Sequence, residues 1–413
     1  MKKCIIGFLS IIFTIIYCYG VIPSQKIDLS AYSPNNRIYY SILPPAYYRV
    51  DYEWYLTNSK QNTLCYKIDG SLYANESGGT YDIAYNKALS LFPSNITARL
   101  GFVDTGIATN HPDFSHLSFI DSRNFIPLMD VHDIQDYNGH GTGAGSIIFA
   151  KGGLKGLLNI TNPIICKTDW GQYDTGDAII YCVNHNAKII NWDNSIANVS
   201  MVGNLSNALS YAQLNGVIVV SATENNNIDV DVVKDYPASW HMDNVITVTS
   251  VDRYGNLYAS SAWGKTSIHL AAPGRLVLNC NGNTNWPYVY QTGTSQAAPM
   301  VSSALIVIAS KYPNQTYHYW IERLLKGVTP EPTLTNVTIS GGTLNFYNPL
   351  TNDIPCVTIS NMNLTISGTF TNSNWLIQHS VDLVKWTDFL TNYSGTYSIS
   401  NNGNKDFFRA RLF

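Results

Sequence analysis

Short apolar segments alternate with helical ones between residues 98 and 274, and this alternation constrains the fold more than any other feature of the chain. The apolar segments are ARLGFVDTG, NPIICKT, KIINWDN, VIVVSATEN, NVITVTSVD and SIHLAAPG. The segments DTGDAIIYCVNHNA and LSNALSYAQLNG have helical spacing, and Gly216 is a helix stop signal. Strands that alternate with helices predict a parallel sheet covered on both faces. We therefore expect a three-layer α/β/α domain.

Polar residues follow several of these expected strands directly. Asp104, the region of Asp193 and Asn225 each come at the end of an apolar segment. In parallel sheets, active residues gather on the loops beyond the carboxyl ends of the strands. These three positions are therefore the first candidates for a functional site.

Three segments carry residues that could act together. GFVDTGIATNHPDF contains Asp104, YNGHGTGAGSII contains His140, and YQTGTSQAAPM contains Ser295 just ahead of a long apolar run that predicts a buried helix. Taken singly, the aspartate is typical of a turn, the histidine of a loop and the serine of a helix cap. As a set they supply a nucleophile, a base to take its proton, and a carboxylate to orient that base. A helix that begins at the nucleophile also directs free N–H groups toward a developing oxyanion.

The motifs DTG, HGT and GTSQAAP, in this order, resemble those of the subtilisin-like serine proteases. VVSATEN resembles the segment that ends at the oxyanion-hole asparagine, which falls on Asn225, and YPAS and LAAPG also stand at family positions. YEWYL and GGTYDIAYNKAL resemble the entry into the catalytic domain, and SGGTLNFYNPL its exit, so the resemblance covers about residues 51–350. It implies a secreted serine endopeptidase in which Ser295 attacks a peptide carbonyl, His140 is the base and Asp104 orients it. Activity is then expected to rise with pH near neutrality, as His140 loses its proton.

The chain departs from the family pattern at the oxyanion segment and at the strand that lines the main specificity pocket. Glu224 replaces the usual glycine before Asn225, and a glutamate would be unfavourable there if the backbone needs a positive φ. The pocket strand, usually Ser-Leu-Gly, contains Asp193 and Asn194, which we take as substrate-binding residues. An acidic wall at Asp193 would favour a basic substrate residue. The alternative is that Asp193 faces solvent.

Two further departures concern metal binding and maturation. The strong calcium site of the family uses a polar loop after the catalytic-histidine helix, but here that region reads AKGGLKG, without carboxylates. Asp113 matches a ligand position and lacks those partners, so we predict no metal at this site and no required cofactor, with calcium elsewhere left open. Residues 21–50 are too few for a folded pro-domain.

The composition excludes some classes of protein. Charged residues make up 13% of the 413-residue chain, against roughly 25% in an average soluble protein. Lysine and arginine form no cluster of the kind that neutralises phosphates, so we expect protein or peptide substrates and no nucleic-acid partner.

The N-terminus predicts export from the cell. Lys2 and Lys3 precede an uncharged, largely apolar stretch, which is typical of a signal peptide over residues 1–20. An uncleaved signal anchor is the alternative, because the stretch is long enough to span a bilayer. We expect a secreted, extracellular or cell-surface protein with an N-terminal extension at 21–50. The cysteines after the signal show no metal-binding spacing, and disulfides and buried free thiols both stay open.

The last part of the chain differs from the rest. Residues 354–413 contain short β segments separated by Asn, Ser and Gly turns, which predicts a small all-β, sandwich-like module after a peptidase domain at 51–350. Attachment to the cell surface through this module is one hypothesis. A second hypothesis concerns the whole chain: Glu224 and the altered pocket strand would suit a catalytically impaired member of the fold that serves as a binding protein.

Overall fold

The computed structural model describes the side chains of residues 53–58, 60, 76, 78–169, 175–198, 203–282 and 287–351. Outside these ranges it describes the backbone of the strands at 39–40, 63–66, 72–75, 356–360, 363–367, 375–380, 387–391, 395–398 and 407–412. The expected signal peptide at 1–20 and most of the extension at 21–50 lie outside the described residues. In the described part of the chain, no helix combines the length and the apolar character that a membrane span requires.

The centre of the molecule is a nine-stranded sheet in the order β13-β14-β10-β9-β8-β7-β4-β6-β5. All neighbouring strands pair in parallel except β13 and β14. Its strands are β4 (Arg99–Asp104), β5 (Arg123–Asn124), β6 (Ile164–Lys167), β7 (Ala187–Trp192), β8 (Ile218–Ala222), β9 (Val245–Val251), β10 (Leu270–Pro273), β13 (Thr329–Pro330) and β14 (Gly342–Thr343). The expected strands are therefore confirmed.

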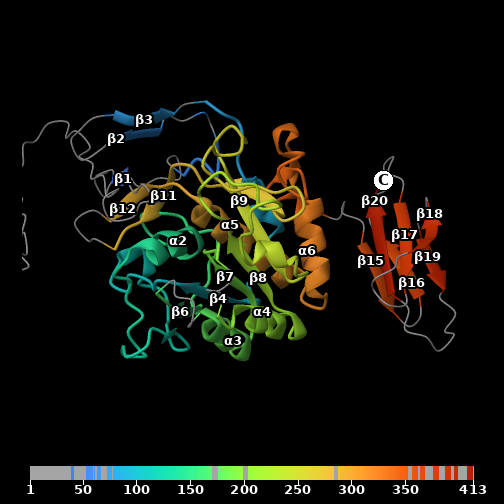
Figure 1. The fold of residues 1–413 in the computed structure, drawn as a ribbon, viewed down its shortest axis with the longest axis horizontal. Coiled ribbons are helices and arrows are strands. Elements are labelled where there is room, and N and C mark those ends of the chain that lie inside the picture. The colour runs from blue at the N-terminus through green and yellow to red at the C-terminus, as the bar shows by residue number, and fades with distance from the viewer. Residues whose placement is uncertain are drawn as a thin grey trace, which may run out of the picture.

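Helices cover both faces of this sheet (Figure 1). Helices α2 (His140–Phe149) and α5 (Thr294–Lys311) pack together on one face, and α3 (Thr175–Asn184) and α4 (Leu205–Leu214) pack together on the other. Helix α6 (Tyr317–Lys326) packs against α5, and the short α1 (Tyr85–Ala88) precedes the sheet. The three-layer α/β/α prediction is confirmed. Gly216, just after α4, has φ +68°, which explains why the helix stops there.

The two faces have separate hydrophobic cores. One includes Ile147, Ile148 and most of the apolar side of α5, and the other includes Cys182, Leu209 and Trp192. Strands β7, β8 and β9 are buried along their length, apart from Lys188, because the sheet is covered on both sides. The central strands therefore form a fixed frame for the loops at their ends.

A hairpin leads into α5. Strands β11 (Val277–Cys280) and β12 (Tyr288–Gln291) pair antiparallel, and β1 (Tyr39–Tyr40) adds to the free edge of β12. Strands β2 (Thr63–Tyr66) and β3 (Leu72–Glu76) form a separate pair. Part of the N-terminal extension is therefore joined by backbone hydrogen bonds to the segment that precedes Ser295.

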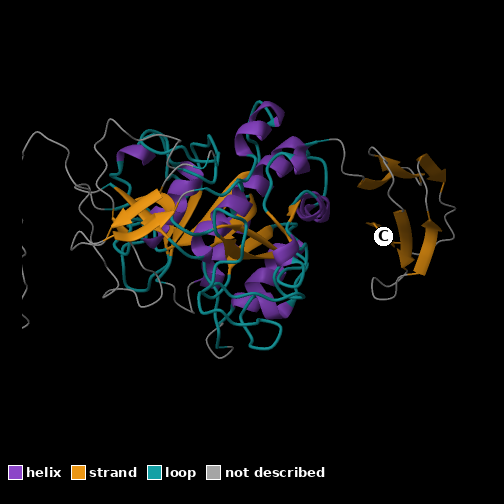
Figure 2. Cartoon of the chain, turned by 90° about the horizontal axis from the view of Figure 1, so that it is seen from above, coloured by secondary structure: helices purple, strands orange, loops and turns teal. Residues whose placement is uncertain are grey.

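Arg323 binds the segment at which the chain leaves the large domain. The buried Arg323 on α6 donates from Nε to the carbonyl oxygen of Pro349 at 2.6 Å, and its Nη2 donates to the carbonyl oxygen of Thr351. Six strands follow, in two three-stranded antiparallel sheets, β15-β16-β19 and β18-β17-β20 (Figure 2). They are β15 (Cys356–Ser360), β16 (Asn363–Ser367), β17 (Trp375–Ser380), β18 (Thr387–Thr391), β19 (Gly395–Ser398) and β20 (Phe407–Leu412). These strands fit the expected all-β module, and its boundaries stay a prediction.

The cysteines whose side chains the structure describes form no disulfide. Cys166, Cys182 and Cys280 are buried free thiols, and the Sγ atoms of Cys166 and Cys182 lie 3.4 Å apart.

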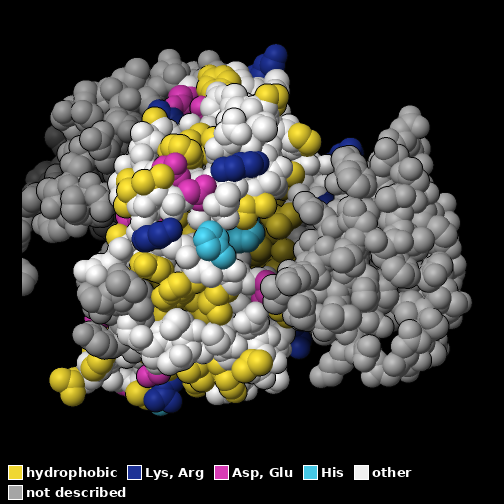
Figure 3. All heavy atoms as spheres, turned by 45° about the vertical axis from the view of Figure 1, so that its right-hand side comes forward, with side chains coloured by type: hydrophobic (Ala, Val, Ile, Leu, Met, Phe, Trp, Pro, Cys, Tyr) yellow, Lys and Arg dark blue, Asp and Glu magenta, His cyan; other side chains and the backbone are white. Residues whose placement is uncertain are grey.

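On the face drawn in Figure 3, acidic and basic side chains are interspersed with apolar ones among the described residues. That face therefore carries no extended surface of a single charge.

Candidate active site

Three adjacent strands of the sheet end at the candidate site. Strands β4, β7 and β8 are neighbours, and their chain directions agree. Asp104 is the last residue of β4, Asp193 directly follows β7, and Asn225 lies just beyond β8. Parallel strands bring their carboxyl ends to one edge, which is why residues far apart in the sequence meet there.

His140 and Asp104 form a buried pair. Nδ1 of His140 lies 2.8 Å from Oδ1 and 3.0 Å from Oδ2 of Asp104, and the backbone N–H of Thr105 donates to the same carboxylate at 2.6 Å. Both side chains are nearly inaccessible to solvent. This contact fixes the orientation of the imidazole and leaves Nε2 as the nitrogen that can take a proton.

Glycine lets the two elements come this close. His140 is the first residue of α2, and Gly141 packs onto the turn that follows β4. A Cβ atom at Gly141 would lie 2.2 Å from the carbonyl oxygen of Gly106, and Gly106 itself has φ +107°. Any larger residue at position 141 would therefore push His140 away from the Asp104 carboxylate.

Asp136 holds the start of α2 and was missed by the sequence analysis. Its Oδ2 accepts the backbone N–H of Thr142 at 2.8 Å and the Thr142 hydroxyl at 2.6 Å, and its Oδ1 accepts the N–H groups of Asn138 and Gly139. A carboxylate at this place binds the unpaired N–H groups of the first helical turn. The only available signal was an aspartate four residues before the histidine of a Gly-flanked helix start.

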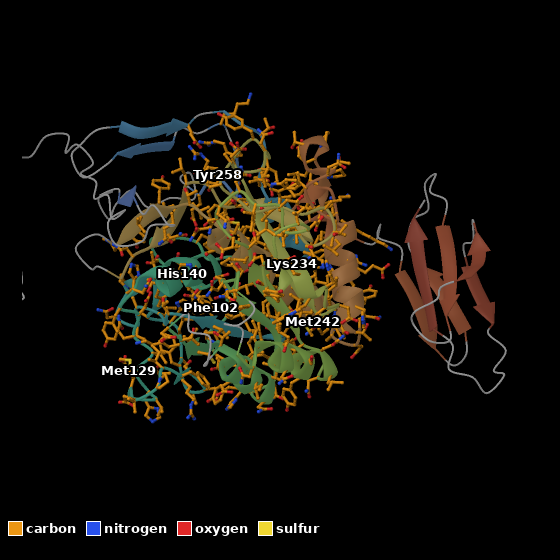
Figure 4. The ribbon with its side chains drawn as sticks, in the orientation of Figure 1. Phe102, Met129, His140, Lys234, Met242 and Tyr258 are labelled. Carbon is orange, nitrogen blue, oxygen red and sulfur yellow. The ribbon has the colours of Figure 1, made fainter. Side chains whose placement is uncertain are left out.

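His140 lies at the start of α2 (Figure 4), and its electrostatic surroundings favour its protonated form. Burial opposes the positive charge, but the charge and the hydrogen bond of Asp104 outweigh it, with support from Asp193 and Asp136, and the pKa of His140 rises to about 9. The expected rise of activity with pH therefore moves from neutrality to the alkaline side.

Ser295 lies in the first turn of α5. The helix begins at Thr294 with Gly293 as its cap, so the interpretation of Ser295 as a capping side chain is wrong. Its hydroxyl instead donates to the backbone carbonyl of Asp193 at 3.2 Å. Gln291 joins the two helix starts: its Oε1 accepts from Gln296 at 3.2 Å, and Gly143 of α2 packs against its side chain.

Asn225 is oriented by the same helix. Its Oδ1 accepts the backbone N–H of Thr294 at 3.0 Å, so its Nδ2 group points away from that bond. Asn225 is partly exposed, so a ligand could reach its Nδ2 group. The backbone of Glu224 does not have the positive φ that would require a glycine. A glutamate therefore causes no backbone strain at this position.

The two expected substrate-binding residues have different surroundings. Asp193 is 3% exposed, so the alternative that it faces solvent is wrong. Its carboxyl oxygens accept no hydrogen bond of normal geometry from described residues, and burial, together with the charge of Asp104, raises the pKa of Asp193. Asn194 is partly exposed, and its carbonyl oxygen accepts the Ser221 hydroxyl at 2.8 Å.

Comparison with known proteins assigns this arrangement to a family. The Subtilase family model (Peptidase S8) matches residues 97–336, which is more than half of the chain and includes Asp104, His140, Asn225 and Ser295. The chain belongs to the subtilase family. The resemblance seen in the sequence is thereby confirmed, and with it membership of a family of serine-type peptidases.

Individual subtilases match the same region. The thermophilic serine proteinase of Bacillus sp. strain AK1 is 30% identical over 262 residues, covering 61% of this chain and 61% of that protein. The major intracellular serine protease of Bacillus subtilis is 34% identical over 225 residues, covering 51% of this chain and 68% of that protein. The chain thus spans under two thirds of the length of the first of these relatives.

Solved subtilase structures share the fold. The epidermin leader peptide processing serine protease EpiP of Staphylococcus aureus superposes with a TM-score of 0.56 at 27% identity, covering 64% of this chain and 77% of that one. The nisin leader peptidase NisP of Lactococcus lactis gives the same TM-score at 21% identity, over 65% and 92% of the two chains, and so supports the fold alone.

The region of the family's strong calcium site is closed by hydrogen bonds. The Asp113 carboxylate accepts the N–H groups of Gly153 and Leu154, both at 2.8 Å, and the Tyr288 hydroxyl at 3.0 Å. His111 and Cys280 lie close enough to Asp113 for a shared metal, but Nδ1 of His111 accepts the N–H of Asp113 and its Nε2 contacts the carbonyl oxygen of Pro287. Calcium requires several oxygen ligands, and one satisfied carboxylate does not supply them.

Proposed function

We propose that the protein is a secreted serine endopeptidase that hydrolyses peptide bonds through Asp104, His140 and Ser295 with an acyl-enzyme intermediate. The observation that supports this most is the buried contact between Nδ1 of His140 and Asp104, at the start of a helix packed against the helix of Ser295. A free hydroxyl is too weak a nucleophile, and a base held in this way is the usual means of activating it.

Catalysis would proceed in steps that each use one of these groups. The Ser295 hydroxyl leaves the carbonyl of Asp193, gives its proton to Nε2 of His140 and attacks the peptide carbonyl carbon. The oxyanion accepts hydrogen bonds from Asn225 Nδ2 and from the backbone N–H of Ser295, which has no partner within the first helical turn. His140 then donates the proton to the leaving amine, and water releases the acyl group by the same route.

A fluorophosphonate probe tests this proposal on the purified full chain. Wild type should be labelled, and Ser295→Ala and His140→Ala should not be, because the probe needs both an activated serine and its base. Circular dichroism of each variant controls for folding. Labelling that persists in Ser295→Ala, or folded wild type that stays unlabelled, would contradict the proposal.

Absence of labelling would favour the second candidate, a catalytically impaired subtilase that serves as a binding protein. The observation behind it is Glu224, a carboxylate directly before Asn225, where it could oppose a negative oxyanion. Secretion and attachment through residues 354–413 belong to the proposal as well. A chain ending after Thr351 keeps both carbonyls that Arg323 binds, so it should stay active and lose any surface retention.

A further inference from the structure

Two carboxyl groups lie beside Asn225 without a basic partner in the described part of the chain. The backbone N–H of Glu224 donates to Oδ2 of Asp235 at 3.2 Å. Asp235 is fully buried, and its Oδ1 accepts no hydrogen bond of normal geometry from any described residue. None of the ion pairs among described residues includes either acid, and Lys234 is exposed to solvent (Figure 4). A buried carboxyl whose hydrogen bonding is this incomplete calls for an explanation.

The segment after β7 leads from the nucleophile to this pair. The carbonyl oxygen of Asp193 accepts the Ser295 hydroxyl at 3.2 Å. Three residues further on, Ile196 and Tyr236 exchange both backbone hydrogen bonds, at 2.8 and 3.0 Å, so Asp235 is held beside this segment. The Ser195 side chain interacts with the Asp235 carboxyl and lowers its pKa. Residues 193–196 therefore run from Ser295 to Asp235.

The segment after β8 flanks the nucleophile on the other side. The Thr294 hydroxyl donates to the carbonyl oxygen of Thr223 at 2.5 Å, and the Thr294 N–H donates to Asn225 at 3.0 Å. Under the proposed function, a peptide carbonyl is held between Ser295 and Asn225. The side chain of the residue that carries this carbonyl must then extend between residues 193–196 and 223–225, toward Glu224 and Asp235.

The surroundings of both acids disfavour their negative charge. Burial raises the pKa of Glu224, and burial together with the nearby Glu224 raises the pKa of Asp235 to about 7. A positively charged side chain between residues 193–196 and 223–225 would lower the pKa values of Glu224 and Asp235, because it would stabilise both carboxylates. Among substrate side chains, only lysine and arginine carry such a charge over the physiological range.

We propose that Glu224 and Asp235 select peptides whose residue on the acyl side of the cleaved bond is lysine or arginine. The inference rests on the proposed function. The half-buried Glu224 contacts the lysine or arginine side chain of the substrate. Asp235 accepts the backbone N–H of Glu224 and adds a second negative charge near that side chain. The sequence analysis expected Asp193 to form an acidic wall of the specificity pocket. In this proposal Glu224 and Asp235 form that wall instead, because the carboxyl of Asp193 interacts with Asp104 and His140.

Matched fluorogenic peptides test the inference. Arginine is compared with citrulline, and lysine with norleucine, so that each pair differs mainly in charge. We expect kcat/KM ratios of about 30-fold or more in favour of the charged residue, the scale of a partly buried charge pair. Glu224→Gln should lower the arginine-to-citrulline ratio about tenfold, and Asp235→Asn should lower it as well. Asp177→Asn on α3, across the sheet, is the matched control and should leave the ratio unchanged.

Charge reversal provides a gain-of-function arm. Glu224→Arg should lose cleavage after arginine and improve cleavage after glutamate. Equal cleavage of the arginine and citrulline peptides by an enzyme that reacts with the fluorophosphonate probe would overturn this inference and leave the proposed function standing. A folded protein that neither reacts with the probe nor cleaves any peptide would overturn the proposed function itself.

Discussion

The side-chain oxygen of Asn225 accepts the backbone N–H of Thr294 at 3.0 Å, so the proposed oxyanion donor is oriented by the helix that carries the nucleophile. The bond uses the acceptor end of the amide and leaves its donor end for the substrate. Any shift of the first turn of α5 would therefore move Ser295 and the Asn225 amide together.

Asn225→Ala should lower kcat by about 10²–10³-fold and change KM little, because the lost hydrogen bond forms to the oxyanion and not to the ground state. Steady-state kinetics on a peptide amide measures the loss in kcat. Asn225→Asp, which keeps the acceptor for Thr294 and removes the donor, should show a similar loss. A variant that mainly raised KM would indicate a binding role instead.

The rate of acylation should rise on the alkaline side of neutrality. His140 must be neutral to act as a base, and its pKa is raised to about 9, so kcat/KM should increase with pH toward that value. Asp193→Asn removes one of the carboxyl groups whose charge raises the pKa of His140, so it should move the midpoint of the profile to lower pH. A wild-type midpoint at or below pH 7 would show that Asp104 raises the pKa of His140 less than the geometry implies.

Stability should fall as the pH rises, because of Glu53. Burial raises the pKa of this carboxyl from 4.5 to about 8, so the folded state holds a proton that the unfolded state has already released. Its stabilising contribution is complete below pH 4.5 and is lost progressively up to about pH 8, by at most about 5 kcal/mol. Glu53→Gln should make the fall in the free energy of unfolding between pH 4.5 and about 8 smaller in urea titrations and leave the parts due to Asp235 and His140, whereas Glu322→Gln on the surface of α6 should leave the fall unchanged.

Calcium should have little effect on the region around Asp113. Its carboxylate already accepts from Gly153, Leu154 and Tyr288, so a cation would have to displace three hydrogen bonds. We expect the melting temperature to be the same within about 1 °C in excess EDTA and in excess calcium, a span smaller than a 1 kcal/mol effect in a domain of this size. Asp113→Ala, which orphans these donors, should cost about 1–3 kcal/mol. A large stabilisation by calcium that Asp113→Ala abolishes would indicate a metal site at this residue after all.

The sequence predicted the residues that are fixed by local pattern. The strands that end near Asp104, Asp193 and Asn225 were visible as apolar runs, and the motifs around Asp104, His140 and Ser295 indicated that these residues act together. Asp136 and Asp235 could not be found in this way, because their roles depend on which loops the fold brings beside them. The burial of Asp193 was equally invisible, since a residue just after a strand can face either solvent or the neighbouring strand end.

The anchor that Arg323 provides at Pro349 and Thr351 has a mechanical consequence. If strands β15–β20 hold the protein to a surface, a pull from that side reaches the large domain first at these two carbonyls. The force then acts on α6 through Arg323 and does not pull directly on the ends of the central strands. A tethered enzyme could in this way bear tension while the spacing between Ser295 and Asn225 stays constant.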